Sequence, residues 1–367
     1  MPARPSRSSN AARSSNAARS SNAARSSNAA RPSVRTTRLR ALAATAVPIA
    51  ALLLAGCAGN STASPDGARA STDTGSSGYP LTIDNCGTEV TFESAPERVV
   101  TVKSSTLELM LALGLEDRVV GSAFSDGPVP EELAEAASGV DVLSDKVPSQ
   151  EATLATEPDL VFAGWESNLS AEGAGDRDTL AKLGVASYVA PAACKGAGYM
   201  PNPLTFDEVF REFEEAGAIF GVPDAATELV AQQRTELDAI EPNTDGLTAL
   251  WYSSGDDTPY VGAGIGAPQM IMQAAGLENV AADVEDTWTA MGWEAIVAAN
   301  PDVIVLVDAA WNTARQKVEL LEANAATAAL PAVQQQRYLV VDFPATEAGV
   351  RNVGAVASLV DQLEALG

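Results

Sequence analysis

A segment that occurs twice in this chain constrains the fold more than any other feature of the sequence. Residues 151–162 (EATLATEPDLVF) align without gaps on residues 294–305 (EAIVAANPDVIV), with Glu, Pro and Asp at the same offsets. In each copy a Glu opens a short helix, Pro ends that helix because it cannot continue the backbone hydrogen-bond ladder, and an apolar strand follows. The repeat therefore predicts two lobes of similar construction.

Strand and helix patterns alternate on both sides of the repeat, which is typical of mostly parallel sheets covered by helices. A hairpin is expected over residues 81–92, whereas residues 206–241 contain two helical stretches and no strand. We therefore expect an α/β fold with two Rossmann-like lobes, residues 80–205 and 242–367, joined by a helical bridge at 206–241, with a ligand cleft between the lobes. Strands are expected at 98–103, 118–121, 160–163, 186–189, 247–253, 303–307 and 337–341, and helices at 105–113, 149–156, 178–183, 206–220, 225–240, 268–275, 293–299 and 350–366.

The N-terminal region has the features of an export signal. Residues 1–33 contain four copies of the hexapeptide Arg-Ser-Ser-Asn-Ala-Ala, which has no apolar face and is expected to stay outside any fold. Arg residues followed by an apolar run predict a signal peptide over residues 34–56, since the run is too short to span a bilayer comfortably.

The apolar run ends in Leu-Ala-Gly-Cys57, which matches the bacterial lipobox. A diacylglyceryl group is therefore expected on Cys57, followed by a flexible tether over residues 57–79. The protein would then lie on the extracytoplasmic face of the cell membrane, held there by its lipid. The alternative is an uncleaved anchor helix that contains a chance cysteine.

Charge is divided very unevenly along the chain. Residues 1–57 hold nine Arg and no acidic residue, whereas the remainder carries 14 basic and 48 acidic residues, a net charge of about −34. Such a surface repels phosphates, so no nucleic-acid partner is expected. The chain also contains no His, which removes the Ser-His-Asp triad, a His general base and a His-rich metal cluster. We expect no enzyme activity, no metal site and no cofactor.

Two cysteines remain after Cys57, and an even number favours a disulfide in an exported protein. A bond between Cys86 and Cys194 would close a loop of roughly a hundred residues, which contributes on the order of 4 kcal/mol in the chain-entropy model. Two unpaired buried thiols are the alternative.

The residues after predicted strands are candidates for ligand binding, because α/β sheets bind ligands at the carboxyl ends of their strands. Lys103, Ser104 and Ser105 combine a cation with hydroxyl groups and suit a carboxylate or a phosphate. An ordinary Ser cap beside a solvated Lys is the alternative. Weaker candidates of the same type are Lys146, Tyr260 and Arg351.

Gly262, Gly264 and Gly266 precede a predicted helix, where they would let the backbone approach a ligand and helix N–H groups face an anion. A plain turn is the alternative. The same residues fit a dinucleotide fingerprint, but no convincing strand precedes them.

Aromatic rings near strand ends can stack on a flat heterocycle, although each ring could instead belong to a lobe core. Four tryptophans lie in such places: Trp165, Trp251, Trp288 and Trp311. Trp165 and Trp311 follow the two equivalent strands, so this pair is expected to face the cleft.

These features together resemble the helical-backbone substrate-binding proteins of ABC importers for siderophores, haem and cobalamin. The resemblance covers residues 80–366 and rests on the lipobox, the hairpin, the segment 95–100, the helix 107–114 and the two Glu-Pro-Asp units. More closely, five motifs resemble an actinobacterial subgroup whose members are named as binding proteins for a precursor of the deazaflavin coenzyme F-420. These motifs are Cys86 and residues 126–130, 192–195, 251–255 and 260–269.

The resemblance implies a protein that binds a small molecule and delivers it to an ABC permease and its ATPase. It also implies that Glu151 and Glu294, one at the tip of each lobe, pair with Arg residues of the permease. The alternative is that Glu simply favours the first turn of a helix. A monomer is expected. The expected ligand is an anionic deazaflavin precursor, and the rivals are ferric siderophore, cobalamin or haem within the same class, or a lipid-anchored enzyme or non-transport receptor.

Overall fold

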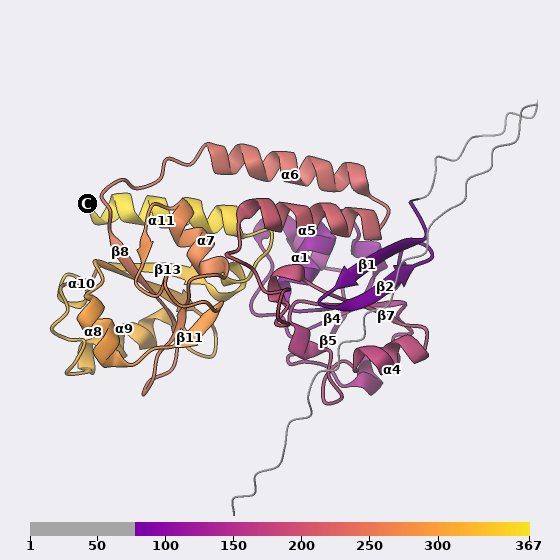
Figure 1. Cartoon of the computed structure of the whole chain (residues 1–367), viewed down its shortest axis with the longest axis horizontal. Coiled ribbons are helices and arrows are strands. Elements are labelled where there is room, and N and C mark those ends of the chain that lie inside the picture. The colour runs from indigo at the N-terminus through magenta and orange to yellow at the C-terminus, as the bar shows by residue number, and fades with distance from the viewer. Residues whose placement is uncertain (1–77) are drawn as a thin grey trace, which may run out of the picture. The chain divides into compact units, whose positions relative to one another are not determined.

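The structure is a computed structural model, and it describes residues 78–367. The hexapeptide repeat, the signal peptide and Cys57 lie outside the described residues. The described part belongs to one compact unit of the chain, Ser71–Gly367, and contains two main sheets, each flanked by helices (Figure 1). None of its helices has both the length and the apolar character needed to cross a bilayer.

The first sheet has five parallel strands in the order β5-β4-β3-β6-β7. Strands β3 (Val99–Val102) and β6 (Leu160–Ala163) are buried along their whole length, as expected for a parallel sheet covered on both faces. The other elements of this lobe are β4 (Val119–Ala123), β5 (Val142–Ser144), β7 (Ala186–Val189), α1 (Ser104–Ala112), α2 (Ala134–Ala137), α3 (Gln150–Leu154) and α4 (Arg177–Lys182).

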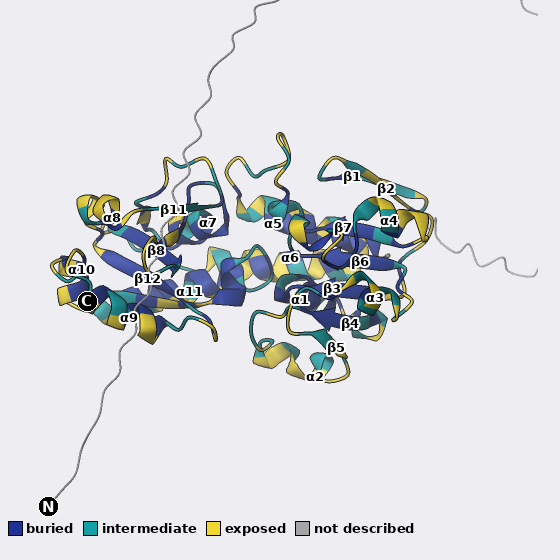
Figure 2. Ribbon diagram, turned by 90° about the horizontal axis from the view of Figure 1, so that it is seen from below, coloured by how far each residue is buried: buried dark blue, intermediate teal, exposed yellow. Residues whose placement is uncertain are grey.

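The second sheet has the order β11-β9-β8-β12-β13, and β10 also pairs with β8. Strands β8 (Thr248–Ser254), β12 (Val303–Asp308) and β13 (Tyr338–Asp342) are parallel, whereas β9 (Tyr260–Gly262) and β11 (Trp288–Ala290) run antiparallel to their neighbours. The other elements are β10 (Glu278–Asn279), α7 (Ala267–Ala274), α8 (Trp293–Ala299), α9 (Ala314–Ala323), α10 (Pro331–Gln334) and α11 (Asn352–Leu366). Figure 2 shows the buried residues concentrated in the strands of both sheets.

A two-stranded hairpin, β1 (Leu81–Asn85) and β2 (Thr88–Phe92), precedes the first sheet. Its turn residues, Cys86 and Gly87, have φ angles of 54° and 82°. Two positive φ angles in a two-residue turn match the right-handed twist of the flanking strands, so the predicted hairpin forms where the sequence places it.

The two repeat units have the same local construction. Helix α3 precedes β6 and helix α8 precedes β12, and the residue before each Pro, Glu157 or Asn300, has a left-handed backbone with φ of 50° or 47°. The Asp after each Pro then accepts a backbone hydrogen bond at the start of the neighbouring strand. Asp159 accepts from the Arg98 N–H at 3.0 Å, and Asp302 accepts from the Thr248 N–H at 2.9 Å. The repeat therefore joins a helix and two strands in each lobe.

Two helices connect the sheets. Helix α5 (Phe206–Ile219) begins with a capping box between Thr205 and Glu208, and α6 (Pro223–Asp238) begins with Pro, both of which are helix-start signals. Figure 1 shows α6 lying along α5 and α11. Because α11 belongs to the second lobe, this layer contacts both halves of the molecule.

Every predicted strand and helix is present, with boundaries within two residues of the prediction. The alternation pattern misses the short elements β5, β9, β10, β11, α2 and α10, and also α9. Three-residue edge strands have too few residues to show a period. Helix α9 was also missed, although its capping box, Thr313 with Gln316, is visible in the sequence.

Candidate ligand-binding site

A cavity of about 420 Å³, here called the cleft, lies between the two lobes. Its walls follow the carboxyl ends of strands from both sheets: Gly164 follows β6, Ala190 follows β7, Ser254 ends β8 and Phe343 follows β13. This edge is where α/β sheets bind ligands, because the loops there are free of strand pairing. The volume lies within the usual range for small-molecule sites, about 300–1,000 Å³.

Aromatic side chains form much of the lining of the cleft. Tyr260 and Trp288 stack in parallel, with ring centroids 6.0 Å apart and planes 12° apart. Trp311 is 60% exposed and packs edge-on against Phe343 at 5.7 Å. Trp165 lines the cleft from the first lobe. The cleft therefore offers several ring surfaces, contributed by both lobes.

Trp165 is fixed in place by three contacts. Its Nε1–H donates to the Glu347 carboxylate at 2.6 Å, which links the two lobes. The Lys103 ammonium lies 3.6 Å from its ring centroid, and Phe124 packs edge-on at 5.5 Å. Burial raises the pKa of the Glu347 carboxyl, while Lys103 and the Trp165 hydrogen bond act in the opposite direction. The ring is therefore presented to the cleft in one orientation.

Lys103 and Ser104, which the sequence analysis expects to bind ligand, are buried and lie outside the lining of the cleft. Lys103 is 1% exposed and forms an ion pair with Asp126, and Ser104 is also buried, with its hydroxyl accepting from the Asp126 N–H at 2.9 Å. Neither residue lines the cleft, whereas Ser105 does. The Lys103 side chain passes beneath Gly164, where an added Cβ would come within 2.7 Å of the Lys103 Cβ. Lys103 supports the cleft from below and does not reach into it.

Two of the three glycines predicted to contact ligand instead allow close packing of the backbone. A Cβ at Gly264 would lie 2.0 Å from the Ala282 carbonyl oxygen, and one at Gly262 would lie 2.4 Å from Pro268. Only Gly266 lines the cleft, just before α7. A strand, β9, does precede this loop, but it is antiparallel to β8 and β11, so the loop is not part of the parallel βαβ unit that a dinucleotide site requires.

Arg351 also lies away from the cleft. Its guanidinium donates to the Glu108 carboxylate at 2.8 and 2.5 Å and to the Pro128 carbonyl at 2.6 Å. Burial raises the pKa of Glu108, and the contact with Arg351 opposes this shift. Arg351 lines a separate cavity beneath α6, so its role in the structure is to join α1 to α11.

The structure places both tryptophans of the predicted pair, Trp165 and Trp311, in the cleft, together with Tyr260 and Trp288. Trp251 is fully buried in a core. The predicted docking residues Glu151 and Glu294 are exposed, each in the first turn of its helix, α3 or α8.

Three charged cleft residues were not predicted: Glu166, Lys195 and Glu347. Lys195 follows a cysteine in one of the subgroup motifs, which is a weak signal for a functional position. Glu166 and Glu347 stand in segments with no periodic pattern, and only their long-range contacts bring them to the cleft.

A family model described as periplasmic binding protein matches residues 99–345. The chain belongs to the periplasmic binding protein family. The ABC transporter substrate-binding lipoprotein YvrC of Bacillus subtilis is 27% identical to it, over 87% of this chain and 95% of that protein. A cobalamin-binding protein of Halobacterium salinarum is 31% identical, over 62% of this chain and 58% of that protein.

Two solved structures agree in fold. A periplasmic binding protein from Veillonella parvula has a TM-score of 0.70 and 29% identity, over 78% of this chain and 97% of that chain. An ABC-type Fe3+-hydroxamate transport system protein from Saccharomonospora viridis has a TM-score of 0.66 and 27% identity, over 78% and 99%. The expected fold, two α/β lobes of the helical-backbone type, is confirmed. This periplasmic binding protein is the substrate-binding component of an ABC transporter and acts outside the cytoplasm, and its relatives are binding proteins rather than enzymes.

Proposed function

We propose that this protein captures a flat fused heterocycle in the cleft and presents it to an ABC permease, and that the ligand is a deazaflavin precursor of coenzyme F-420. The observation that carries the proposal is the set of aromatic rings from both lobes around one cavity, with Trp165 on one side and the Tyr260–Trp288 stack on the other. Offset stacking on such rings contributes about 0.5–1.5 kcal/mol per pair beyond the burial of area.

The lack of histidine and the small number of cations in the cleft weigh against haem and against a highly anionic siderophore. Haem iron is commonly held by a protein His, and the chain contains none. The cleft also has one lining cation among the described residues, Lys195, which suits a ligand of low negative charge better than a highly anionic siderophore. The alternative cargo of the same class, cobalamin, is supported by the names of relatives such as the Halobacterium protein.

The test is titration of the purified protein with four ligands: a deazaflavin precursor, cobalamin, haem and a ferric hydroxamate siderophore. Quenching of tryptophan fluorescence reports binding, because Trp165, Trp288 and Trp311 all line the cleft. Trp165→Leu should weaken deazaflavin binding by about threefold to tenfold through the loss of stacking. Tight binding of cobalamin or siderophore with no binding of the deazaflavin would overturn the ligand assignment.

Glu151 and Glu294 are proposed to dock on the permease. Both are exposed at equivalent places in the two repeat units, so they could engage Arg residues on two similar transporter subunits, where charge-assisted pairs fix the register. Glu151→Ala and Glu294→Ala should each lower transport while leaving ligand affinity unchanged. Glu364→Ala, an exposed Glu of α11, is the control. Normal transport by the double variant would exclude the docking role.

Anchoring through a lipid on Cys57 is part of the same proposal, and Cys57→Ser should release the protein from cells into the medium. We further propose that the released protein is a monomer, which its sedimentation would test.

A further inference from the structure

Lys195 is the only basic residue of the described chain that lines the cleft. Its ammonium donates to the Thr287 hydroxyl at 2.6 Å and lies 3.6 Å from the Asp286 carboxylate, both on the opposite lobe. The Lys195 side chain is 54% exposed and that of Asp286 is 50% exposed. An ion pair this open to water contributes little, so the ammonium can exchange these partners for an anionic group on a ligand.

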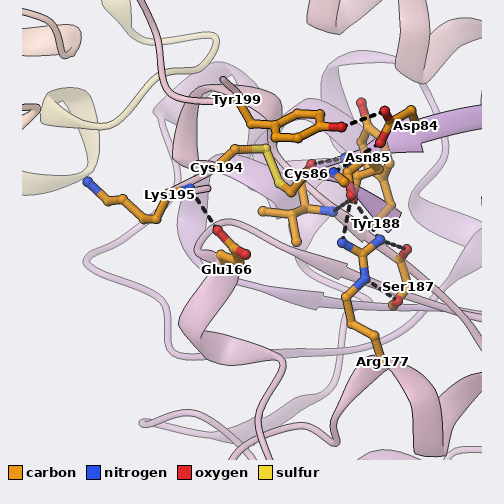
Figure 3. Close-up of a disulfide and its surroundings, with 12 residues drawn as sticks. Asp84, Asn85, Cys86, Glu166, Arg177, Ser187, Tyr188, Cys194, Lys195 and Tyr199 are labelled. Carbon is orange, nitrogen blue, oxygen red and sulfur yellow. Dashed lines mark hydrogen bonds between the residues drawn. A yellow bond between two sulfur atoms is a disulfide. The ribbon is translucent and has the colours of Figure 1, made fainter. Parts of the chain in front are cut away.

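The backbone beside Lys195 is clamped to the hairpin β1–β2. Cys194 forms a disulfide with Cys86 in the hairpin turn, 108 residues away in sequence. Four residues beyond Lys195, the Tyr199 hydroxyl donates to the Asp84 carboxylate at 2.7 Å (Figure 3). The Lys195 N–H donates to Glu166 at 2.7 Å. Attachments on both sides therefore hold this loop at the cleft wall.

The hairpin turn is itself fixed to the sheet. The side chain of Asn85 is buried and makes two hydrogen bonds of 2.8 Å with the backbone of Val189, the last residue of β7. Arg177 donates to the Asn85 carbonyl and side-chain oxygens at 2.8 and 2.9 Å, as Figure 3 shows. The Cys86–Cys194 disulfide and the Tyr199–Asp84 hydrogen bond, here called the clamp, thus connect the loop that carries Lys195 to the first sheet.

Three carboxylates lie in or next to the cleft with this cation. Glu166 and Glu347 also line the cleft, and Asp286 adjoins it through Lys195. One ammonium among three carboxylates can compensate one negative charge on a ligand, and further negative charges would meet repulsion and incomplete desolvation.

We propose that Lys195 is a specificity-determining residue that selects an aromatic ligand carrying one carboxylate, and that the clamp formed by Cys86–Cys194 and Tyr199–Asp84 positions it. The inference rests on the proposed binding of a fused ring in the cleft. It further specifies that the ligand carries one negative charge. The carboxylate takes the place of Thr287 and Asp286 at the Lys195 ammonium.

Three probes test the inference: one 5-deazaflavin ring with an uncharged side chain, with one carboxylate, or with three carboxylates. Wild-type protein should bind the monocarboxylate about tenfold more tightly than the uncharged probe, as a charge-assisted hydrogen bond provides, and the tricarboxylate more weakly than the monocarboxylate. Lys195→Met should reduce that tenfold preference to about one without changing the affinity for the uncharged probe. The control variant Lys182→Met, at an exposed lysine of α4 in the same lobe, should keep the tenfold preference for the monocarboxylate.

Equal binding of the uncharged and monocarboxylate probes by wild type, or a preference that survives in Lys195→Met, would overturn the role of Lys195 while leaving ring binding intact. No binding of any probe would overturn the proposed ligand as well. For the clamp, Cys86→Ser/Cys194→Ser and, separately, Tyr199→Phe should each lower the preference by about twofold or more. If both retain the full preference, the clamp does not position Lys195.

Discussion

The two lobes share a scaffold but differ in how they hold the walls of the cleft. In both, the Pro-Asp step of the repeat ties the start of one parallel strand to the start of the next through an Asp carboxylate. Only the first lobe has a disulfide among the described residues, and the buried lysines of the two lobes have different partners. Lys103 pairs with the Asp126 carboxylate, whereas Lys317 donates to the carbonyls of Val307 and Asn312 at 2.7 and 2.6 Å.

The contacts that the lobes share stabilise the scaffold, whereas the contacts found in one lobe hold the site. The shared Asp contacts stabilise strand starts, away from the carboxyl ends that form the cleft. The ion pair and disulfide of the first lobe lie directly behind cleft residues, under Trp165 and beside Lys195. The first lobe therefore has the more strongly fixed wall, and four predictions test that difference in order of decreasing effect.

Lys103→Met should have the largest effect, because it leaves the Asp126 carboxylate buried without its cation. Loss of one partner of a buried pair costs about 3–5 kcal/mol, which urea unfolding would measure. Burial already raises the pKa of Asp126, and Lys103 opposes this shift. The loss of stability in Lys103→Met should therefore grow as the pH rises and Asp126 ionises. Lys103→Met/Asp126→Asn is the matched control and should recover much of the stability. A single variant as stable as wild type would show that the pair is not needed.

The disulfide should rank second. Cys86→Ser/Cys194→Ser should lower the free energy of unfolding by about 2–4 kcal/mol, because the bond restricts the unfolded chain. Hydrogen exchange should show faster opening in the first lobe, around β1, β2 and β7, with the second lobe unchanged. Equal acceleration in both lobes would mean that the clamp stabilises the whole molecule rather than one wall.

The repeat itself should give matched effects. Asp159→Ala and Asp302→Ala each remove a carboxylate that accepts backbone N–H bonds, and each should cost about 1–2 kcal/mol in thermal or urea unfolding. Backbone and side-chain bonds from Thr248 lower the pKa of Asp302. Its stabilisation is therefore present above the carboxyl's unfolded pKa and is lost as the pH falls through the lower folded value. Costs that differ severalfold at neutral pH would break the equivalence of the two units.

Lys317→Met should have the smallest effect, about 1 kcal/mol or less at pH 7. Burial lowers the pKa of Lys317 from 10.5 to about 8, so between these values the unfolded chain binds more protons than the folded protein. Stability from this group therefore rises with pH across that window. The Lys317→Met variant should lack this rise, so the difference between the wild-type and variant pH–stability curves should increase with pH across the same window. Parallel curves would show that Lys317 titrates normally.

The order of strands and helices was predictable because its signals are local. Pro, capping residues and apolar periods act within a few positions of the chain, so they predict the hairpin, the repeat units and the helices α5 and α6 from sequence alone. The cleft aromatics Trp165 and Trp311 were predictable for the same reason, since they follow strands whose carboxyl ends meet at one edge. Strands of two or three residues, such as β10 and β9, were not, because no period is visible over so short a stretch.

The sequence by itself determined the paired α/β lobes, the helices between them and the absence of histidine chemistry. Only the tertiary structure decided which charges face the cleft. Glu108 and Arg351 are 243 residues apart, and Trp165 and Glu347 are 182 apart, yet these contacts hold Arg351 away from the site and bring Glu347 into it. A cation after a strand has the same local pattern whether water or a distant carboxylate surrounds it, so the folded packing alone assigned Lys103 to support and Lys195 to the cleft.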